Sequence, residues 1–500
     1  MDNDQLIESA GALALLLCYR RLQNVPTRKV KRKRKSFHHY RKEYHPSKTY
    51  WWKEYVIGDK FNDPLLKDKM EKRFRRLFAI PRPLFLHIVT RAKSESWFPE
   101  YTRVDDTGLP LDITGIYLIP LELKILCALM VLTKGLSFHT VSEFSQGDHE
   151  ETHRTFFHLF IEIMVLRLFE DEVHLPKTEN ELNKVLKVYS QLGYPGCCFS
   201  MDCVHIKWKN CPFRYRNQFH SYKNGCPCIS YNVSCNHSGF ISTVSQGEYA
   251  TMPDSLIVRF DLSVLPLLND PLFKNKKYNL YADNDTTIEC QGVYGLTDNG
   301  YLSHKLFAFP LKGALNENFY NWSKRTESVR KDIECVFGKL KVRFQILNHY
   351  IQTQDKVKID RIFKTCCILH NMILKFDGYD SRLYDASNWI QERNSTNEDE
   401  YHLHTLYDVD SHYDNDDADD PHHETIRNES TNHTNTVTTS RGTNNDNISA
   451  FLGYNTRLKF TGIYETESTK AEHGAHIVKL VNHYKIASSK YEIYWPKSIR

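Results

Sequence analysis

Apolar residues recur at helical spacing through much of the chain between residues 61 and 185. From Lys69 to about Arg91 this spacing predicts helix that is broken at Pro81 and Pro83. Three more helices are predicted over Leu121–Thr133, Ser137–Phe144 and Glu150–Phe169. We therefore expect an all-α region over residues 61–185.

Two interpretations of the last three helices stay open. Two short helices and a longer third, with Gly135 at a turn, are compatible with a helix-turn-helix that binds DNA. They are equally compatible with a helical bundle that packs on a neighbouring part of the chain. The third helix carries Phe156, Phe157 and Phe160, which are more aromatic residues than a face reading a DNA groove requires.

The pattern changes to strands after residue 190. Short β-branched or aromatic runs, separated by Asn, Gly, Pro and Lys, predict strands over Cys197–Trp208, Pro227–Cys235, Phe240–Gln246 and Tyr294–Thr297. A long helix is predicted from Asn316, as its N-cap, to about Leu347, and another over Ile359–Leu374. The fold class expected for residues 190–378 is therefore α/β, with a mixed sheet flanked by helices.

Composition separates the two ends of the chain from this core. Residues 1–60 are polar, basic and aromatic, and we expect them to be partly disordered. Residues 380–448 are rich in Asn, Asp, Thr and His, which predicts a disordered acidic tail that links to a short ordered segment over 449–500. The apolar runs Gly11–Cys18 and Ile125–Leu132 fall far short of the ~20 residues of a membrane span, so no membrane partner is expected.

Charge is segregated along the chain although the net charge is only +5. Residues 1–100 hold 23 Lys and Arg against 11 Asp and Glu, whereas residues 381–450 hold 4 against 15. The run Arg28–Lys35 has seven cations in eight residues, which is typical of a nuclear-import signal or a nucleic-acid-binding arm, and also of a solvated basic loop. Thirteen cysteines in 500 residues indicate a reduced intracellular compartment, and we expect a nuclear location.

Three acidic residues stand where carboxylates are unusual. Asp202 lies inside an apolar strand, Asp298 ends another short strand, and Glu334 lies where the polar and apolar faces of the long helix meet. If they converge at one edge of the sheet, their mutual repulsion calls for a cation, and Mg²⁺ or Mn²⁺ prefers such oxygen ligands. Seven Lys and Arg on the same helix suit a phosphate backbone, so one hypothesis is a nuclease that uses two divalent ions.

A zinc-binding module is the competing hypothesis. Its candidate ligands lie in one stretch of the chain: Cys203, His205, Cys211, His220, Cys226, Cys228, Cys235 and His237. The stretch lacks a CxxC pair, and alternation along strands directs several of these side chains to opposite faces. We expect His205 to be a packed residue near Asp202 rather than a ligand.

Several motifs, taken in order, resemble the Harbinger-type transposases of the DDE superfamily. The resemblance is strong from Gly193 to about Asp377. It is carried by Met201–Ile206, Asn210–Pro212, Ser230–Val233, Met252–Asp261, Thr297–Tyr301, Glu327–Phe344 and Thr365–Asn371, and more loosely by Leu480–Tyr484 and Tyr494–Pro496.

The resemblance implies an RNase H-like catalytic core in which Asp202, Asp298 and Glu334 form the catalytic triad. Asp298 and Glu334 are 36 positions apart, close to the usual interval of the superfamily. Asp254 matches a further acid of the family, as a metal ligand or a structural residue, although Ala250-Thr251-Met252 replaces the usual glycine turn before it. In this scheme Asp202 bridges two Mg²⁺ or Mn²⁺ ions, Asp298 holds one, and Glu334 holds the other.

The implied reaction is hydrolysis of DNA phosphodiester bonds at transposon ends, followed by strand transfer into target DNA. Arg330, Lys331 and Lys341 would neutralise phosphates nearby. The family commonly works with a Myb-like DNA-binding partner protein, and an oligomer on DNA is expected. The alternative is a domesticated, catalytically silent nuclear factor that binds DNA or protein. Such factors often lose one of the acids, and all of them are present in this chain.

Overall fold

The computed structural model describes residues 44–99, 103–145, 150–313, 316–349, 351, 353–379, 461–490 and 493. The basic run Arg28–Lys35 and the acidic tail over residues 380–448 lie outside this part of the chain. Among the helices of the described residues, none combines the length and the apolar character that crossing a bilayer requires.

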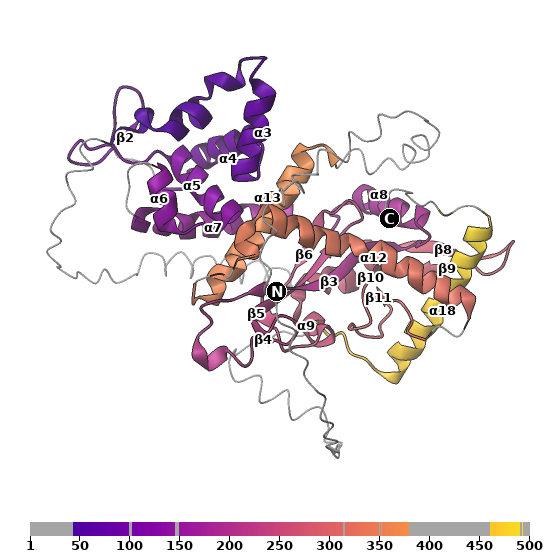
Figure 1. The fold of residues 1–500 in the computed structure, drawn as a ribbon. Coiled ribbons are helices and arrows are strands. Elements are labelled where there is room, and N and C mark those ends of the chain that lie inside the picture. Colours follow the sequence, from indigo (N-terminus) through magenta and orange to yellow (C-terminus); the bar gives the residue numbers. More distant parts are fainter. Residues whose placement is uncertain are drawn as a thin grey trace, which may run out of the picture.

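The first part of the described chain is helical (Figure 1). Its main helices are α3 (Lys67–Phe78), α4 (Arg82–Ser94), α5 (Leu121–Lys134), α6 (Phe138–Ser145), α7 (Glu150–Glu172) and α8 (Glu179–Gln191). Short 3-10 or π turns precede them at Pro46–Lys48, Trp52–Ile57 and Asp59–Phe61, and a small hairpin joins β1 (Arg103–Val104) to β2 (Pro110–Leu111).

The helices predicted in this region are confirmed, with ends that differ from the predicted ones by up to three residues. Ala79 takes a left-handed conformation (φ 61°) after α3, and Pro81 is the N-cap of α4, so the break falls where the prolines placed it. Gly135 (φ 64°) ends α5. Helix α8 was not predicted, although Thr178 caps it by accepting a hydrogen bond from the backbone N–H of Glu181.

The centre of the molecule is a seven-stranded mixed sheet, which confirms the predicted fold class. Its strands are β3 (Cys197–Lys207), β4 (His220–Ser221), β5 (Cys226–Cys235), β6 (Ile241–Val244), β7 (Glu248–Tyr249), β10 (Tyr294–Leu296) and β11 (Phe307–Ala308). Strand β3 pairs antiparallel with β5, which pairs antiparallel with β6. On the other side of β3, β10 and then β11 run parallel to it.

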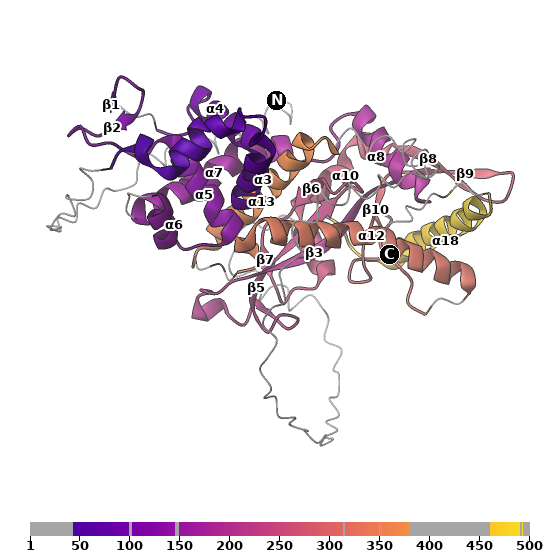
Figure 2. The ribbon, with the colours of Figure 1, turned by 45° about the horizontal axis from the view of Figure 1, so that its top comes forward.

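Helices flank this sheet (Figures 1 and 2). The longest, α12 (Glu317–Arg343), packs against β3 and begins at Asn316, whose side chain accepts a hydrogen bond from the backbone N–H of Phe319 at 3.1 Å. The helix ends four residues before the predicted Leu347 because Phe344 leaves the helical conformation (φ −119°, ψ 84°). The other helices after β7 are α9 (Asp254–Phe260), α10 (Leu265–Asn269), α11 (Pro271–Lys274), α13 (Lys356–Phe376) and α18 (Glu467–Ser489). A separate hairpin joins β8 (Lys277–Tyr281) to β9 (Thr287–Gln291). There are 3-10 turns at Phe213–Tyr215, between β3 and β4, and at Leu262–Val264 and Gln345–Leu347.

Two hydrophobic clusters form the core around the sheet. One joins α3–α7, α12 and α13 to Val204 and Ile206 of β3. The other joins α8, β10, β11 and α18 to Phe199 and Met201 of the same strand. The first half of β3 therefore contributes to the second cluster, and its second half contributes to the first. The N-terminal helices therefore share a continuous core with the sheet.

Helix α7 connects the N-terminal helices to the rest of the fold. It packs against α5, α6 and α13. Phe156, Phe157 and Phe160, the aromatic residues noted in the sequence, are buried in the first cluster. This is the packing that the helical-bundle interpretation describes.

Candidate metal centre

Three aspartates come together where β10 ends beside the middle of β3. Leu296 of β10 is in register with Ser200 of β3, and the two strands run parallel. Asp298 and Asp202 each follow these partners by two residues, so the register brings them side by side. Asp254 reaches the same place from a different element, as the first residue of α9 after its N-cap Pro253.

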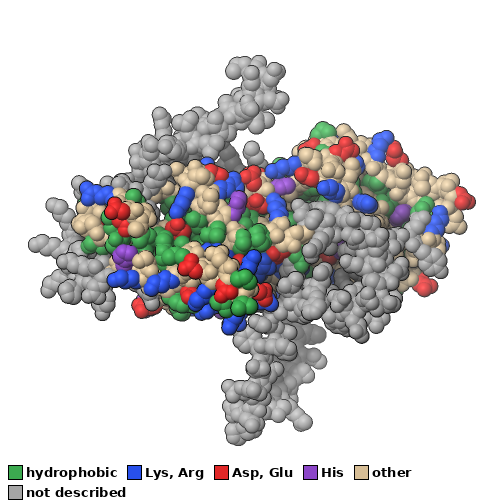
Figure 3. Space-filling view, turned by 90° about the horizontal axis from the view of Figure 1, so that it is seen from above, with side chains coloured by type: hydrophobic (Ala, Val, Ile, Leu, Met, Phe, Trp, Pro, Cys, Tyr) green, Lys and Arg blue, Asp and Glu red, His purple; other side chains and the backbone are tan. Residues whose placement is uncertain are grey.

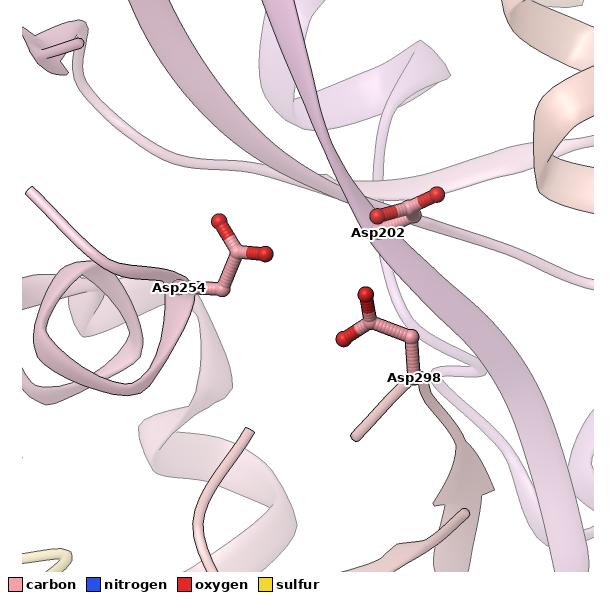
Figure 4. A group of neighbouring side chains, drawn as sticks. All are labelled: Asp202, Asp254 and Asp298. Atoms are coloured by element: carbon pink, nitrogen blue, oxygen red, sulfur yellow. The ribbon is translucent and has the colours of Figure 1, made fainter. Parts of the chain in front are cut away.

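The three carboxylates point toward one another (Figure 4). One ligand atom from each of Asp202, Asp254 and Asp298 lies within 4.8 Å of the other two. Gly300 leaves the space that this requires, because a Cβ atom there would lie 3.0 Å from Asp298 Oδ1 and 3.1 Å from Asp254 Oδ2. The Gly300 backbone N–H also donates a hydrogen bond to Asp298 Oδ1 at 2.8 Å. Oxygen ligands at this spacing fit one hard divalent cation such as Mg²⁺ or Mn²⁺.

Burial disfavours the ionised form of the carboxylates in this cluster. It raises the pKa of Asp202 from the ordinary 3.8 to about 6; Arg330 opposes the rise, and the charges of Asp298 and Asp254 add to it. Burial likewise raises the pKa of Asp254, while the Cys203 thiol, which donates to it, opposes that rise. A bound cation would stabilise the ionised forms of both carboxylates, so the cluster favours a cation over protons near neutral pH.

Arg330 links the cluster to the fourth predicted residue, Glu334. Its guanidinium is buried and donates to Asp202 Oδ2 at 3.1 Å and to Glu334 Oε1 at 2.7 Å. Glu334 lies one helical turn after Arg330, and its side chain is 46% exposed. The structure thus brings Asp202, Asp298 and Asp254 into one group, whereas Glu334 reaches that group through Arg330.

A buried polar network lies next to the aspartate cluster. The Tyr301 hydroxyl donates to Asn232 Oδ1, and Asn232 Nδ2 donates to Asp261 Oδ2, each at 2.6 Å. The Cys203 thiol lies 3.6 Å from the Tyr301 hydroxyl, next to Asp202. The sequence suggested no role for Tyr301, Asn232 or Asp261 individually, although an asparagine inside the apolar strand β5 was a visible signal.

The residues proposed for zinc do not assemble in the part of the chain that the structure describes. There, the one group of three or more potential ligands that meet is the aspartate cluster. Cys226 and Cys228 approach to 3.9 Å between their sulfur atoms, without a third ligand among the described side chains. His205 Nδ1 lies 2.8 Å from the Ser221 hydroxyl, so it is engaged in packing beside the site.

Comparison with known proteins agrees with the predicted resemblance. Residues 172–380 match the family model described as plant transposon protein. The chain is also 22% identical, over 315 residues, to "Protein ALP1-like" from Arabidopsis thaliana, an alignment that covers 61% of this chain and 71% of that protein. No solved structure matches the chain.

Proposed function

We propose that this chain, which carries a Harbinger-type, transposase-related segment over residues 172–380, is a divalent-metal-dependent DNA endonuclease of the DDE type. The observation that carries this proposal is the convergence of Asp202, Asp254 and Asp298 from three separate elements. Carboxylates within 4.8 Å of one another repel when they are ionised, and a bound divalent cation would offset that repulsion.

The sheet supports an RNase H-like core, the fold that the resemblance implies. Its antiparallel strands β6, β5 and β3 are followed across the sheet by the parallel strands β10 and β11. Asp202 lies on β3, the first long strand of this core, and α12 packs against that strand. Asp202 on β3 and Asp298, two residues beyond the end of β10, support the first two members of the predicted triad.

Each residue of the site has a role in this proposal. Asp202, Asp254 and Asp298 would hold a divalent ion, and Glu334 would complete the predicted set for a second. Bound Mg²⁺ or Mn²⁺ supplies activation of a water or a 3′-hydroxyl and neutralises charge on the phosphodiester. Arg330 holds Asp202 and Glu334 in a fixed relation, since its guanidinium donates to both.

Positive charge gathers beside the carboxylates. Burial lowers the pKa of Lys341, and the charges of Lys207 and Lys223 lower it further, so the three ammonium groups are within electrostatic range of one another. The charge of Lys223 also acts on Asp254. A phosphate backbone that approached the acidic cluster would meet these cations, which supports DNA as the substrate.

The proposal extends to the biological context that the resemblance implies. The substrates would be transposon ends and a target site, cleaved and joined in DNA transposition by an oligomer in the nucleus, with a Myb-like partner protein for sequence-specific binding. The sequence supports the nuclear location through the basic run Arg28–Lys35.

Cleavage of DNA that carries the candidate terminal repeats tests the proposal. The full chain should cut near these repeats with Mg²⁺ or Mn²⁺ and not with a chelator. Asp202→Ala, Asp298→Ala, Asp254→Ala and Glu334→Ala should each abolish cleavage, while Glu327→Ala, at an exposed acid of the same helix, should not. Cleavage that persists in all four site variants would refute the assignment.

A second candidate function is a catalytically silent factor that binds DNA or protein. The observation that favours it is the Arg330 guanidinium, which is a cation already placed between Asp202 and Glu334. Binding of DNA by the wild-type chain, with no cleavage and no bound Mn²⁺ by electron paramagnetic resonance, would support this candidate over the nuclease.

A further inference from the structure

Two aromatic rings are exposed on the segment between β3 and β5. Phe213, in the 3-10 turn Phe213–Tyr215, is 88% exposed, and Tyr222, in the turn between β4 and β5, is 86% exposed. Large aromatic side chains left almost fully in water contribute nothing to folding, because they bury no apolar surface. Two of them on one short segment therefore point to a ligand.

The same segment, residues 209–225, is strongly basic. Its exposed cations are Lys209, Arg214, Arg216 and Lys223, and the sequence holds no Asp or Glu from residue 203 to residue 247. Within the described chain, none of these four forms an ion pair with a carboxylate. By contrast, Figure 3 shows a face of the molecule on which basic and acidic side chains are intermixed. A local excess of positive charge that the fold does not neutralise fits a polyanion.

The exposed rings stand on an ordered framework. Trp208 is buried and donates from Nε1 to the carbonyl oxygen of Thr353 at 2.7 Å. Phe219 is buried, and its ring centroid lies 4.9 Å from that of Trp208 and 4.8 Å from that of Tyr249. Strand β4 is also fixed, because it pairs with β5. Because the backbone is already fixed, binding a ligand to the rings would cost little conformational entropy.

The segment borders the aspartate cluster. The Thr251 hydroxyl donates to the carbonyl oxygen of Gln218 at 2.9 Å, and Thr251 precedes Asp254 by three residues. The Ser221 hydroxyl bonds His205 on β3, the strand that carries Asp202. Figure 1 likewise shows β4 close to α9. A DNA strand held by the segment would thus lie beside the carboxylates.

We propose that residues 209–225 bind single-stranded DNA, with unpaired bases stacked on Phe213 and Tyr222 and the backbone held by the four cations. Aromatic faces interleaved with cations bind single strands because every base has a π face that can stack, whereas paired bases in a blunt duplex present only their terminal faces. The inference rests on the proposed function for its choice of DNA. It adds that the protein distinguishes an unpaired end from an intact duplex.

Fluorescence anisotropy with the full chain in a chelator tests this inference without cleavage. The probes are a short single strand of mixed sequence, a blunt duplex, and that duplex with a single-stranded overhang. Phe213→Ala and Tyr222→Ala should each weaken binding of the single strand and the overhang by about 5- to 150-fold, the range for loss of one stacked base. Binding of the blunt duplex should change much less.

Conservative variants and a control separate stacking from general hydrophobicity. Phe213→Trp should retain single-strand binding, and Phe213→Leu should lose as much as Phe213→Ala. Tyr320→Ala, which removes a 57% exposed tyrosine on α12, should leave all three affinities unchanged.

Three results would overturn the inference. The Phe213 and Tyr222 variants could lose as much affinity for the blunt duplex as for the single strand, or could keep wild-type affinity for all three probes. The third result is that wild type binds an acidic peptide more tightly than the single strand. Cleavage by a chain that does not prefer single strands would overturn the inference and leave the nuclease proposal standing. If the chain never cleaves DNA but prefers single strands, and Phe213→Ala loses that preference, the inference stands and the nuclease proposal fails.

Discussion

Replacing Asp202 with asparagine should stabilise the metal-free protein. Asp202 is a metal ligand in the proposed function, so its ionised carboxylate would be stabilised by the bound cation. Without a cation, the ionised carboxylate is 19% exposed and lies beside Asp254 and Asp298. Asparagine has nearly the same shape as the protonated carboxyl group and cannot ionise, so it removes the cost of the charge.

The size of the effect follows from the pKa of Asp202. A value of about 6 in the folded protein, against the ordinary 3.8, corresponds to about 3 kcal/mol. The folded state holds the proton more tightly than the unfolded state. Between these two pKa values, therefore, the free energy of unfolding falls as the pH rises, and above about pH 6 the full cost is present. Asp202→Asn should lack this fall and should be more stable than wild type at pH 8 by up to about 3 kcal/mol.

Urea unfolding in a chelator at pH 5 and pH 8 measures this difference. A matched control is Asp377→Asn, because Asp377 is 14% exposed and accepts two hydrogen bonds from Arg75, at 2.5 and 3.1 Å, without acidic neighbours in the metal cluster. That variant should be less stable than wild type, since it weakens a charge-assisted pair. The reasoning is refuted if Asp202→Asn is no more stable than wild type at pH 8 while Asp377→Asn behaves as expected.

Three further perturbations follow from the same structure. Arg330→Ala should raise the pKa of Asp202 further by removing its cationic partner, so half-maximal Mn²⁺ binding, followed by electron paramagnetic resonance, should move to higher pH; an unchanged midpoint would contradict this. Gly300→Ala should weaken Mn²⁺ binding in isothermal titration calorimetry, because its Cβ would crowd two carboxylate oxygens at 3.0 and 3.1 Å; wild-type affinity would show that the cluster tolerates the methyl group. Asn371→Ala should lower the free energy of unfolding by about 2–4 kcal/mol, since it leaves both backbone groups of Ile241 and one carbonyl of α7 without their buried partner; a loss in urea unfolding below about 1 kcal/mol would contradict this.

The local part of the fold could be predicted from the sequence because short-range signals set it. Asn316 caps α12 and Gly135 ends α5, as their residue types indicate. Helix α8 carried the same kind of signal, since Thr178 and Glu181 have the spacing of a capping box. The hairpin β8–β9 was not predicted either, although it also carried a signal. Polar and apolar residues alternate along Lys277–Leu280 and along Thr287–Gln291, which is the pattern of a half-buried strand.

The arrangement of the site could be predicted less completely, because it depends on contacts between distant segments. Proximity of Asp202 and Asp298 rests on the register of two parallel strands almost a hundred residues apart, which no local pattern specifies. Asp254 joins them through the packing of α9. The pairing of Arg330 with Glu334 is different, since a spacing of four residues on a helix predicts that ion pair directly.

The two hydrophobic clusters have a consequence for which part of the chain can fold on its own. The segment that matches the family model, residues 172–380, contains the sheet and α13 but neither the helices α3–α6 nor α18. Those helices fill the two hydrophobic clusters, with Ile477, Leu480 and Val481 of α18 buried in the second. The matched segment is thus smaller than the unit that folds. A gene fragment that encoded residues 172–380 alone would yield a chain with apolar surface of both clusters open to water, prone to aggregation even with its acidic residues intact.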